Sequence, residues 1–296
     1  MRTLAGLWVA CVLSAGCERT EHTREASQIV VRDDAGRSVE LARPATRIVS
    51  LMPTVTDLVI ALGHADRLIA RTEYDVDPAI AHLPSIGGGL TPSVEWLASQ
   101  KPDLVVSWPD NASRSLVGKI EAAGIPVYAA RTEVVADALR TIRHLGILLA
   151  ATSAADSLAR SIAAALDSTR ASVAGKRPVR AAYVLAVQPP TVAGPGTFID
   201  ELMRIAGGEN VFGDIARPWP EVNLEEIIRR DPDVIVLARE SASDPQLLLE
   251  TLPGWRELRA VRAGHVHRVS PDYFNRSGPY MPRAARELSQ FFERAR

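Results

Sequence analysis

Two glutamates occupy the same place in two segments that follow one pattern. Glu95 lies in SVEWLASQKPDLVVSW, residues 93–108, and Glu225 lies in NLEEIIRRDPDVIVLA, residues 223–238. In each segment the Glu opens a short amphipathic stretch, Pro-Asp ends it, and a β-branched apolar run follows. A carboxylate near a helix N-terminus is favourable by about 0.3–1 kcal/mol whatever the function. A helix and a buried strand used twice predict two α/β lobes, and a cleft between lobes is the commonest place for a small molecule to bind.

Two tryptophans are candidates for contact with a ligand. Trp219 lies between Pro218 and Pro220. Because proline cannot continue a helix or a central strand, this segment is expected to be a rigid loop that holds the ring in place. Trp108 ends a predicted strand at its C-terminal end, where α/β lobes bind ligands. A flat, partly apolar ligand would gain from burial against such rings. The alternative for both residues is a tryptophan that caps the hydrophobic core.

The sequence offers little for metal or covalent chemistry. His265 and His267 would share one face of a strand, but no third histidine or carboxylate is paired with them, and a first-row metal normally needs three or four ligands. Exposed histidines at a strand edge are the favoured interpretation. The chain has no Gly-x-Ser-x-Gly elbow, no phosphate loop and no dinucleotide fingerprint. We therefore expect no catalytic residue, no metal site and no cofactor.

Alternating strand and helix patterns over residues 28–132 predict a first α/β lobe with a parallel sheet. Thr54 to Asp57 are expected to cap a helix, and residues 74–92 are expected to be loop. The predicted elements are a hairpin at 28–41, strands at 47–53, 68–71, 104–107 and 126–129, and helices at 55–62, 93–100 and 112–123.

Residues 133–174 show apolar positions at helical spacing and predict one long helix, bent near Gly146 or Thr152. A helix of about 40 residues would be roughly 60 Å long, so it is expected to run between the lobes as a stiff spine. Residues 175–296 predict the second lobe. Its expected elements are strands at 180–187, 234–237 and 266–269, and helices at 197–206, 223–230, 246–251 and 279–294.

The first 17 residues have the pattern of a signal peptide, with an apolar run at 4–13 that is too short to span a membrane. Cys17 follows Ala-Gly and resembles the cysteine of a bacterial lipobox, which is lipidated; the alternative is an ordinary secreted protein that is cut nearby. Residues 18–27 are charged and aperiodic and predict a tether. Either interpretation places the protein in the periplasm or otherwise outside the cytoplasmic membrane. The net charge of −1 gives no field that would recruit nucleic acid.

Several short sequence segments, taken in their order along the chain, resemble those of one protein family. They are DDAGRSV at 33–39, RIVSLMPTVTDLVIALG at 47–63, KPDLV at 101–105 and AGGENVF at 206–212. In this order they are similar to ABC-importer substrate-binding proteins of the iron-siderophore, haem and cobalamin group, over about residues 28–294. The resemblance implies a class III periplasmic-binding-protein fold, with two Rossmann-like α/β lobes joined by a single long helix. It also implies a monomer that binds a small molecule and delivers it to a permease dimer.

Within this group the cobalamin binders are most similar, through QPP at 188–190, RPWPEV at 217–222 and PDYFNRSGP at 271–279. The chain departs from them at Gly89, Thr191 and Tyr280, where they have Trp, Phe and Arg. These departures remove aromatic area, so haem or a ferric siderophore is the alternative to cobalamin or another corrinoid. The resemblance implies a ligand-binding set of Pro53, Tyr74, Trp108, Thr191, Trp219, Tyr273, Phe274 and Arg276. For Arg276, a solvated surface position is the alternative.

The resemblance gives Glu95 and Glu225 a second role. In this family one Glu of each lobe docks onto arginines of the two permease subunits, and the twofold placement of the pair suits a symmetric partner. The opposing class is an enzyme built on two α/β lobes with an active site in the cleft. It is disfavoured because the cleft loops offer aromatic residues, Pro and Gly in place of a nucleophile with a base.

Overall fold

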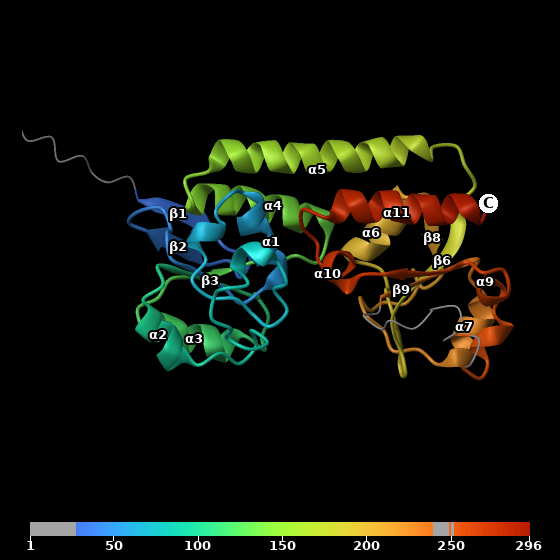
Figure 1. Ribbon diagram of the computed structural model, residues 1–296, viewed down its shortest axis with the longest axis horizontal. Coiled ribbons are helices and arrows are strands. Elements are labelled where there is room, and N and C mark those ends of the chain that lie inside the picture. The colour runs from blue at the N-terminus through green and yellow to red at the C-terminus, as the bar shows by residue number, and fades with distance from the viewer. Residues whose placement is uncertain (1–27, 239–248, 250–251) are drawn as a thin grey trace, which may run out of the picture.

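The computed structural model describes residues 28–238, 249 and 252–296, and within them two α/β lobes lie side by side beneath a long helix (Figure 1). The predicted signal peptide at 1–17, the lipidation of Cys17 and the tether at 18–27 lie outside the described residues. So does the predicted helix at 246–251, apart from residue 249.

The first lobe is built on a parallel sheet of order β3-β4-β5. Its strands are short and wholly buried, which is typical of parallel sheets covered on both faces. The elements are β1 (Ile29–Arg32), β2 (Ser38–Leu41), β3 (Ile48–Ser50), α1 (Pro53–Ala61), α2 (Val94–Gln100), β4 (Leu104–Ser107), α3 (Arg114–Ala122) and β5 (Val127–Ala129). Strands β1 and β2 form the predicted antiparallel hairpin.

Two predictions in this lobe are wrong in detail. The expected strand at 68–71 is reduced to single bridges, because Leu68 pairs with Ile48 while Arg71 already pairs with Ser85 and so leaves the sheet. Helix α1 begins at Pro53 without a side-chain cap, so Thr54 does not cap it. Proline suits the first position of a helix because its fixed φ is helical and its missing N–H has no partner there in any case.

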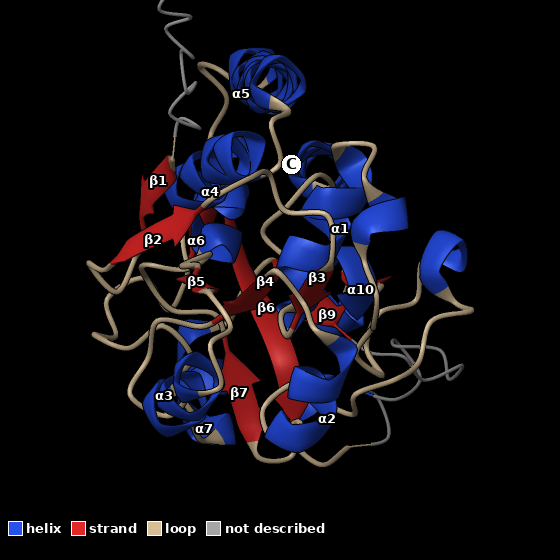
Figure 2. Ribbon diagram, turned by 90° about the vertical axis from the view of Figure 1, so that its left-hand side faces the viewer, coloured by secondary structure: helices blue, strands red, loops and turns tan. Residues whose placement is uncertain are grey.

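The segment predicted as one helix over 133–174 contains two helices, α4 (Val135–Leu148) and α5 (Thr152–Ser172). The chain turns between them at Ala150, whose φ of 54° lies in the left-handed region. Helix α5 then passes back over α4 and across to the second lobe, as Figures 1 and 2 show. The prediction that a single long helix joins the two lobes is confirmed. This helix is α5 alone, and α4 packs against it.

The second lobe has a sheet of order β10-β9-β6-β7, with β8 also paired to β6. All its pairs are parallel except β6 with β7. The strands are β6 (Val179–Val187), β7 (Pro190–Val192), β8 (Gly208–Asn210), β9 (Val234–Ala238) and β10 (Val266–Val269). The helices are α6 (Phe198–Ile205), α7 (Leu224–Arg230), α9 (Arg259–Arg262), α10 (Pro271–Phe274) and α11 (Met281–Arg294). The sequence did not predict β7, β8, α9 or α10.

One hydrophobic core runs through both lobes. It includes Leu58 of α1, Ile162 of α5, Leu202 of α6 and Leu288 of α11, all of which are buried. Helix α11 contributes a stripe at helical spacing, Met281, Ala284, Ala285, Leu288 and Phe292. Each lobe also has its own smaller core on the other face of its sheet. The lobes therefore share a spine of packed side chains in addition to the chain connection through α5.

Candidate functional site

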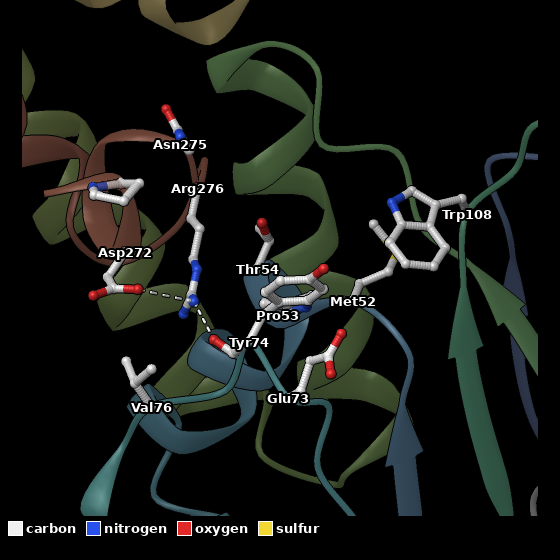
Figure 3. Close-up of a pocket in the computed structure, with 11 residues that line it drawn as sticks. Met52, Pro53, Thr54, Glu73, Tyr74, Val76, Trp108, Asp272, Asn275 and Arg276 are labelled. Carbon is white, nitrogen blue, oxygen red and sulfur yellow. Dashed lines mark hydrogen bonds and ion pairs between the residues drawn. The ribbon is translucent and has the colours of Figure 1, made fainter. Parts of the chain in front are cut away.

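A cavity of about 780 Å³ lies between the two lobes (Figure 3). The first lobe supplies Met52, Pro53, Thr54, Glu73, Tyr74, Val76 and Trp108, and the second supplies Pro271, Asp272, Asn275 and Arg276. A volume of this size is in the range of small-molecule sites.

The parallel sheets explain why these residues meet. Met52 and Pro53 follow the C-terminal end of β3, Trp108 follows that of β4, and Pro271 follows that of β10. Because the carboxyl ends of parallel strands lie at one edge of a sheet, residues just beyond them gather at that edge. The predicted position of Trp108 at the end of a strand is confirmed.

Tyr74 stands at the mouth of the cavity with a relative exposure of 56%. Its loop is held by local hydrogen bonds: the Thr72 N–H donates to Asp75 at 2.6 Å, and the Tyr74 N–H donates to the Thr72 hydroxyl at 3.2 Å. The loop is also joined to the neighbouring glycine-rich segment, because the Glu73 N–H donates to the Gly87 carbonyl at 2.9 Å. An exposed aromatic ring on an anchored loop is available to a ligand at little cost in ordering.

Arg276 is buried, with a relative exposure of 8%, so the surface alternative for it is wrong. Its guanidinium donates to Asp57 on α1 at 3.1 Å, donates to the Tyr74 carbonyl, and lies 3.5 Å from Asp272. Burial raises the pKa of Asp57 to about 6, and the charge of Arg276 acts in the opposite direction. Arg276 thus ties the segment after α10 to the first lobe across the cavity wall.

The structure brings together four of the eight predicted ligand-binding residues, Pro53, Tyr74, Trp108 and Arg276. The prediction for Phe274 is wrong, because its ring is fully buried in the shared core. Tyr273 does not line the cavity either: its ring packs under the Arg283 guanidinium at 4.3 Å and near Tyr280. An aromatic residue in a loop-like sequence carries no signal that tells a core ring from a cavity ring.

Thr191 and Trp219 lie on neighbouring segments of the second lobe, outside the lining of this cavity. Thr191 is in β7 and bridges to Glu221, and Trp219 has a relative exposure of 38%. The segment around Trp219 is fixed along β7, since the Gly194 N–H donates to the Pro218 carbonyl at 2.8 Å and the Val192 N–H donates to that of Pro220 at 3.1 Å. The predicted rigidity of this segment is therefore present, while a ligand contact for Thr191 or Trp219 stays a prediction.

Sequence reasoning missed the polar members of the lining, Thr54, Glu73, Asp272 and Asn275. Each is adjacent in sequence to a predicted residue, so nearness to Pro53, Tyr74, Tyr273 or Arg276 was the available signal. The glycine at position 89 also has a reason. Its φ is +83°, and a Cβ there would lie 2.3 Å from the Leu51 carbonyl oxygen, so this backbone excludes a tryptophan at that position.

The two predicted docking helices have matching structures. Ser93 caps α2 by accepting the Trp96 N–H at 3.1 Å, and Asn223 caps α7 by accepting the Glu226 N–H at 2.8 Å. Both helices run seven residues with the same sequence of burial, and both end at a left-handed residue, Lys101 or Asp231. Glu95 and Glu225 are exposed in the first turns, and both helices lie on the side of the molecule away from α5 (Figures 1 and 2).

Across the described residues no group of three or more His, Cys, Asp or Glu side chains could hold a metal ion. The expectation of exposed strand-edge histidines is wrong for His267, whose ring stacks on Phe291 at 4.0 Å between centroids. Burial lowers the pKa of His267 to about 4. None of the described helices is long and apolar enough to cross a membrane.

Two α/β lobes joined by one long helix, with a cavity between them, are the architecture of a solute-binding protein. The comparison with known families agrees: residues 48–273 match the periplasmic binding protein family, and the chain belongs to it. The family resemblance seen in the sequence is therefore confirmed.

Individual relatives point in more than one direction. The vitamin B12-binding protein of Vibrio parahaemolyticus is 30% identical over 252 residues, which are 84% of this chain and 90% of that protein. The crystal structure of the periplasmic vitamin B12-binding protein BtuF of Vibrio cholerae superposes with a TM-score of 0.74 at 27% identity, over 85% of this chain and 98% of that one. The periplasmic haem-binding protein RhuT of Roseiflexus superposes with a TM-score of 0.76 at 25% identity, over 85% and 99%.

Proposed function

We propose that this protein binds cobalamin or a related corrinoid between its lobes and delivers it intact to an ABC importer. The observation that carries the proposal is the cavity of about 780 Å³ with Trp108, Tyr74 and Pro53 on one wall and α10 with the residues that follow it on the other. Flat rings with a partly apolar face gain most from such walls. The vitamin B12-binding relatives, at up to 30% identity over most of the chain, support the same ligand class.

The binding experiment uses residues 28–296 mixed separately with cyanocobalamin, haem and a ferric siderophore, then desalted and examined by visible spectroscopy. Cyanocobalamin should be retained and should bind at micromolar affinity or tighter, worth about 8 kcal/mol. Recovery of an unchanged ligand from the complex distinguishes binding from turnover. Retention of haem alone would overturn the proposal in favour of the family's other ligand class.

A pair of tryptophan variants tests the site within this proposal. Trp108→Ala should weaken cyanocobalamin binding by about 2 kcal/mol, the loss expected of an aromatic anchor in a buried contact. Trp219→Ala makes the same change outside the cavity lining. A loss of similar size there would show that the ligand extends to β7, and an unchanged affinity in both folded variants would remove the site from this cavity.

Delivery would rest on the two matching helices. Glu95 and Glu225 are exposed at equivalent positions of α2 and α7, and these two helices lie on one side of the molecule (Figure 1), which suits two basic subunits related by a twofold axis. Lipidation at Cys17 would hold the protein at a membrane surface. Membrane fractionation of a Cys17→Ser variant tests the anchor: release into the soluble fraction is expected, and retention would contradict lipidation.

A further inference from the structure

The charges around the cavity are unequal. Among the described residues that line it, Glu73 and Asp272 carry negative charge and Arg276 is the one cation. The positive charge of Arg276 is already matched by Asp57, which lies behind the wall at 3.1 Å, and Asp272 approaches the same guanidinium only to 3.5 Å. A ligand therefore meets an excess of negative charge at this site.

Glu73 is the carboxylate that a ligand would meet first. It is exposed, and the described residues give its side chain no hydrogen bond or ion pair. Figure 3 shows it beside Tyr74, on the same wall of the cavity as Trp108. Gly88 makes room for both: an atom at its Cβ position would lie 3.3 Å from Glu73 Oε1 and 3.4 Å from Tyr74 Cε2.

This arrangement favours one ligand chemistry over another. A ligand ring that lies against Tyr74 brings its peripheral groups to Glu73. An amide N–H there would donate a charge-assisted hydrogen bond to the carboxylate. A carboxylate in the same place would be repelled, and the paired Arg276 has no free charge to compensate.

We propose that Glu73 is a specificity-determining residue, which selects corrinoids whose ring edge carries amides over tetrapyrroles whose edge carries carboxylates. The proposal rests on the corrinoid-binding function proposed above and adds to it which chemical feature of the ligand is selected, and by which residue. It predicts that discrimination between the two classes depends on the charge of Glu73 and not on its size.

The test compares ligands whose ring edges carry different groups, and other differences between them, such as the nucleotide loop that cyanocobalamin has and cobyrinic acid lacks, cancel when Glu73→Gln is compared with the wild type. Cyanocobalamin presents amides, cobyrinic acid presents carboxylates on the same corrin ring, and haem presents propionates on a flatter ring. Affinities are measured for the wild-type protein, for Glu73→Gln, which removes the charge and keeps the shape, and for Glu209→Gln, the same change at an exposed residue outside this cavity. Glu73→Gln should narrow the preference for cyanocobalamin over cobyrinic acid by about tenfold, the size of one charge interaction at a partly exposed site.

Ionic strength provides a second measurement. The preference of the wild-type protein should weaken between low and high salt, while that of Glu73→Gln should change little. Glu209→Gln should behave as the wild type in both experiments.

The outcomes separate this inference from the proposed function. If the wild-type protein binds cyanocobalamin and Glu73→Gln leaves the preference unchanged, the role of Glu73 is refuted and corrinoid binding stands. Wild-type binding of haem in preference to every corrinoid would refute both, because propionates would then be accepted beside Glu73. An equal loss of affinity for all ligands in a folded Glu73→Gln protein would make Glu73 a general contact and would also refute selection.

Discussion

The buried ion pair between Asp57 and Arg276 determines the charge at one wall of the cavity. Both side chains are buried, and desolvation outweighs the attraction of Arg276 in setting the pKa of Asp57, which lies at about 6. The pair therefore does not follow the usual behaviour of a salt-bridged aspartate, whose pKa falls below its ordinary value. Its contribution to stability should have the opposite dependence on pH.

We expect the stability due to Asp57 to be fully present below the ordinary pKa of 3.8 and to be lost as the pH rises through about 6. The folded state holds the proton more tightly than the unfolded state, so stability falls with rising pH in this window. Urea unfolding of the wild type and of Asp57→Asn at pH 4 and pH 7 measures the effect. The wild type should lose about 2 kcal/mol relative to the variant across that interval. A constant difference between the two proteins would contradict the raised pKa.

The sequence predicted which residues lie at the cavity when those residues directly follow a strand. It did not predict contacts between residues that are far apart in the sequence. Trp108 could be placed at the cavity because the end of its strand could be read from an apolar run, whereas Pro53 came from the family resemblance. The pairing of Arg276 with Asp57 could not be read, because 219 positions separate the two and neither has a local signature. Phe274 was misplaced for a related reason, since the packing that buries it comes from elements distant in sequence.

At the scale of elements, the turn between α4 and α5 is the largest departure from the sequence prediction. Residues 149–151 are Leu-Ala-Ala, with neither Gly nor Pro to mark a turn. Apolar spacing continues on both sides, so periodicity indicated one helix with a bend near Gly146 or Thr152, whereas the chain reverses its direction just before Thr152. The helices cross closely at Gly146, where an added Cβ would lie 2.4 Å from the Ala155 Cβ. By contrast, α2 and α7 were predicted almost to the residue, because each has a capping side chain and a Pro-Asp end.

The close crossing predicts a clear effect of substitution at Gly146. Gly146→Ala should destabilise the protein by about 1–3 kcal/mol, because the new methyl group forces α4 and α5 apart. Gly118→Ala is the matched control: Gly118 lies in α3, and an added methyl group there would meet nothing within 4 Å, so it should stabilise by about 0.5–1 kcal/mol. Thermal or urea unfolding of both variants measures whether the free energy of unfolding falls for Gly146→Ala and rises for Gly118→Ala. Equal effects would show that the crossing can relax without cost.

The matching of α2 and α7 predicts what the two glutamates do. Replacing Glu95 and Glu225 together by Ala should leave cyanocobalamin affinity unchanged, since neither lines the cavity, while uptake through the importer is abolished. Charge pairs at such an interface set orientation and rate of association, and loss of one partner of a buried pair costs about 2–5 kcal/mol. Binding and uptake should be measured in the same double variant. Uptake at the wild-type rate would leave the glutamates as helix-terminal carboxylates only.

For the whole molecule, the shared core and the connection through α5 oppose a wide hinge motion between the lobes. Side chains of α1, α5, α6 and α11 pack in one cluster, so opening the cleft would expose buried apolar surface. Two lobes of alternating strands and helices were predictable from periodicity, and that part of the fold is confirmed. The contribution of α11 to the spine was not, because amphipathic spacing identifies a buried face but not its partner.

We therefore expect the ligand-free and ligand-bound forms to have nearly the same dimensions. X-ray scattering curves of residues 28–296 with and without cyanocobalamin should superimpose over the low-angle region. A marked fall in the radius of gyration on binding would show that the lobes rotate against each other and that the spine yields.

The contacts made by Arg276 and Ser277 also make the first lobe depend on residues that lie far along the chain. Arg276 donates to Asp57, and the Ser277 hydroxyl donates to the Thr132 carbonyl. One wall of the cavity beside the first lobe is therefore formed by residues near the C-terminus. Closing a loop of 219 residues costs about 5 kcal/mol in chain entropy when the loop is unfolded. A chain cut before Arg276 would leave Asp57 buried without its cation and the cavity with one side missing. The binding site is therefore complete only in a chain that has been extended through Arg276 and Ser277.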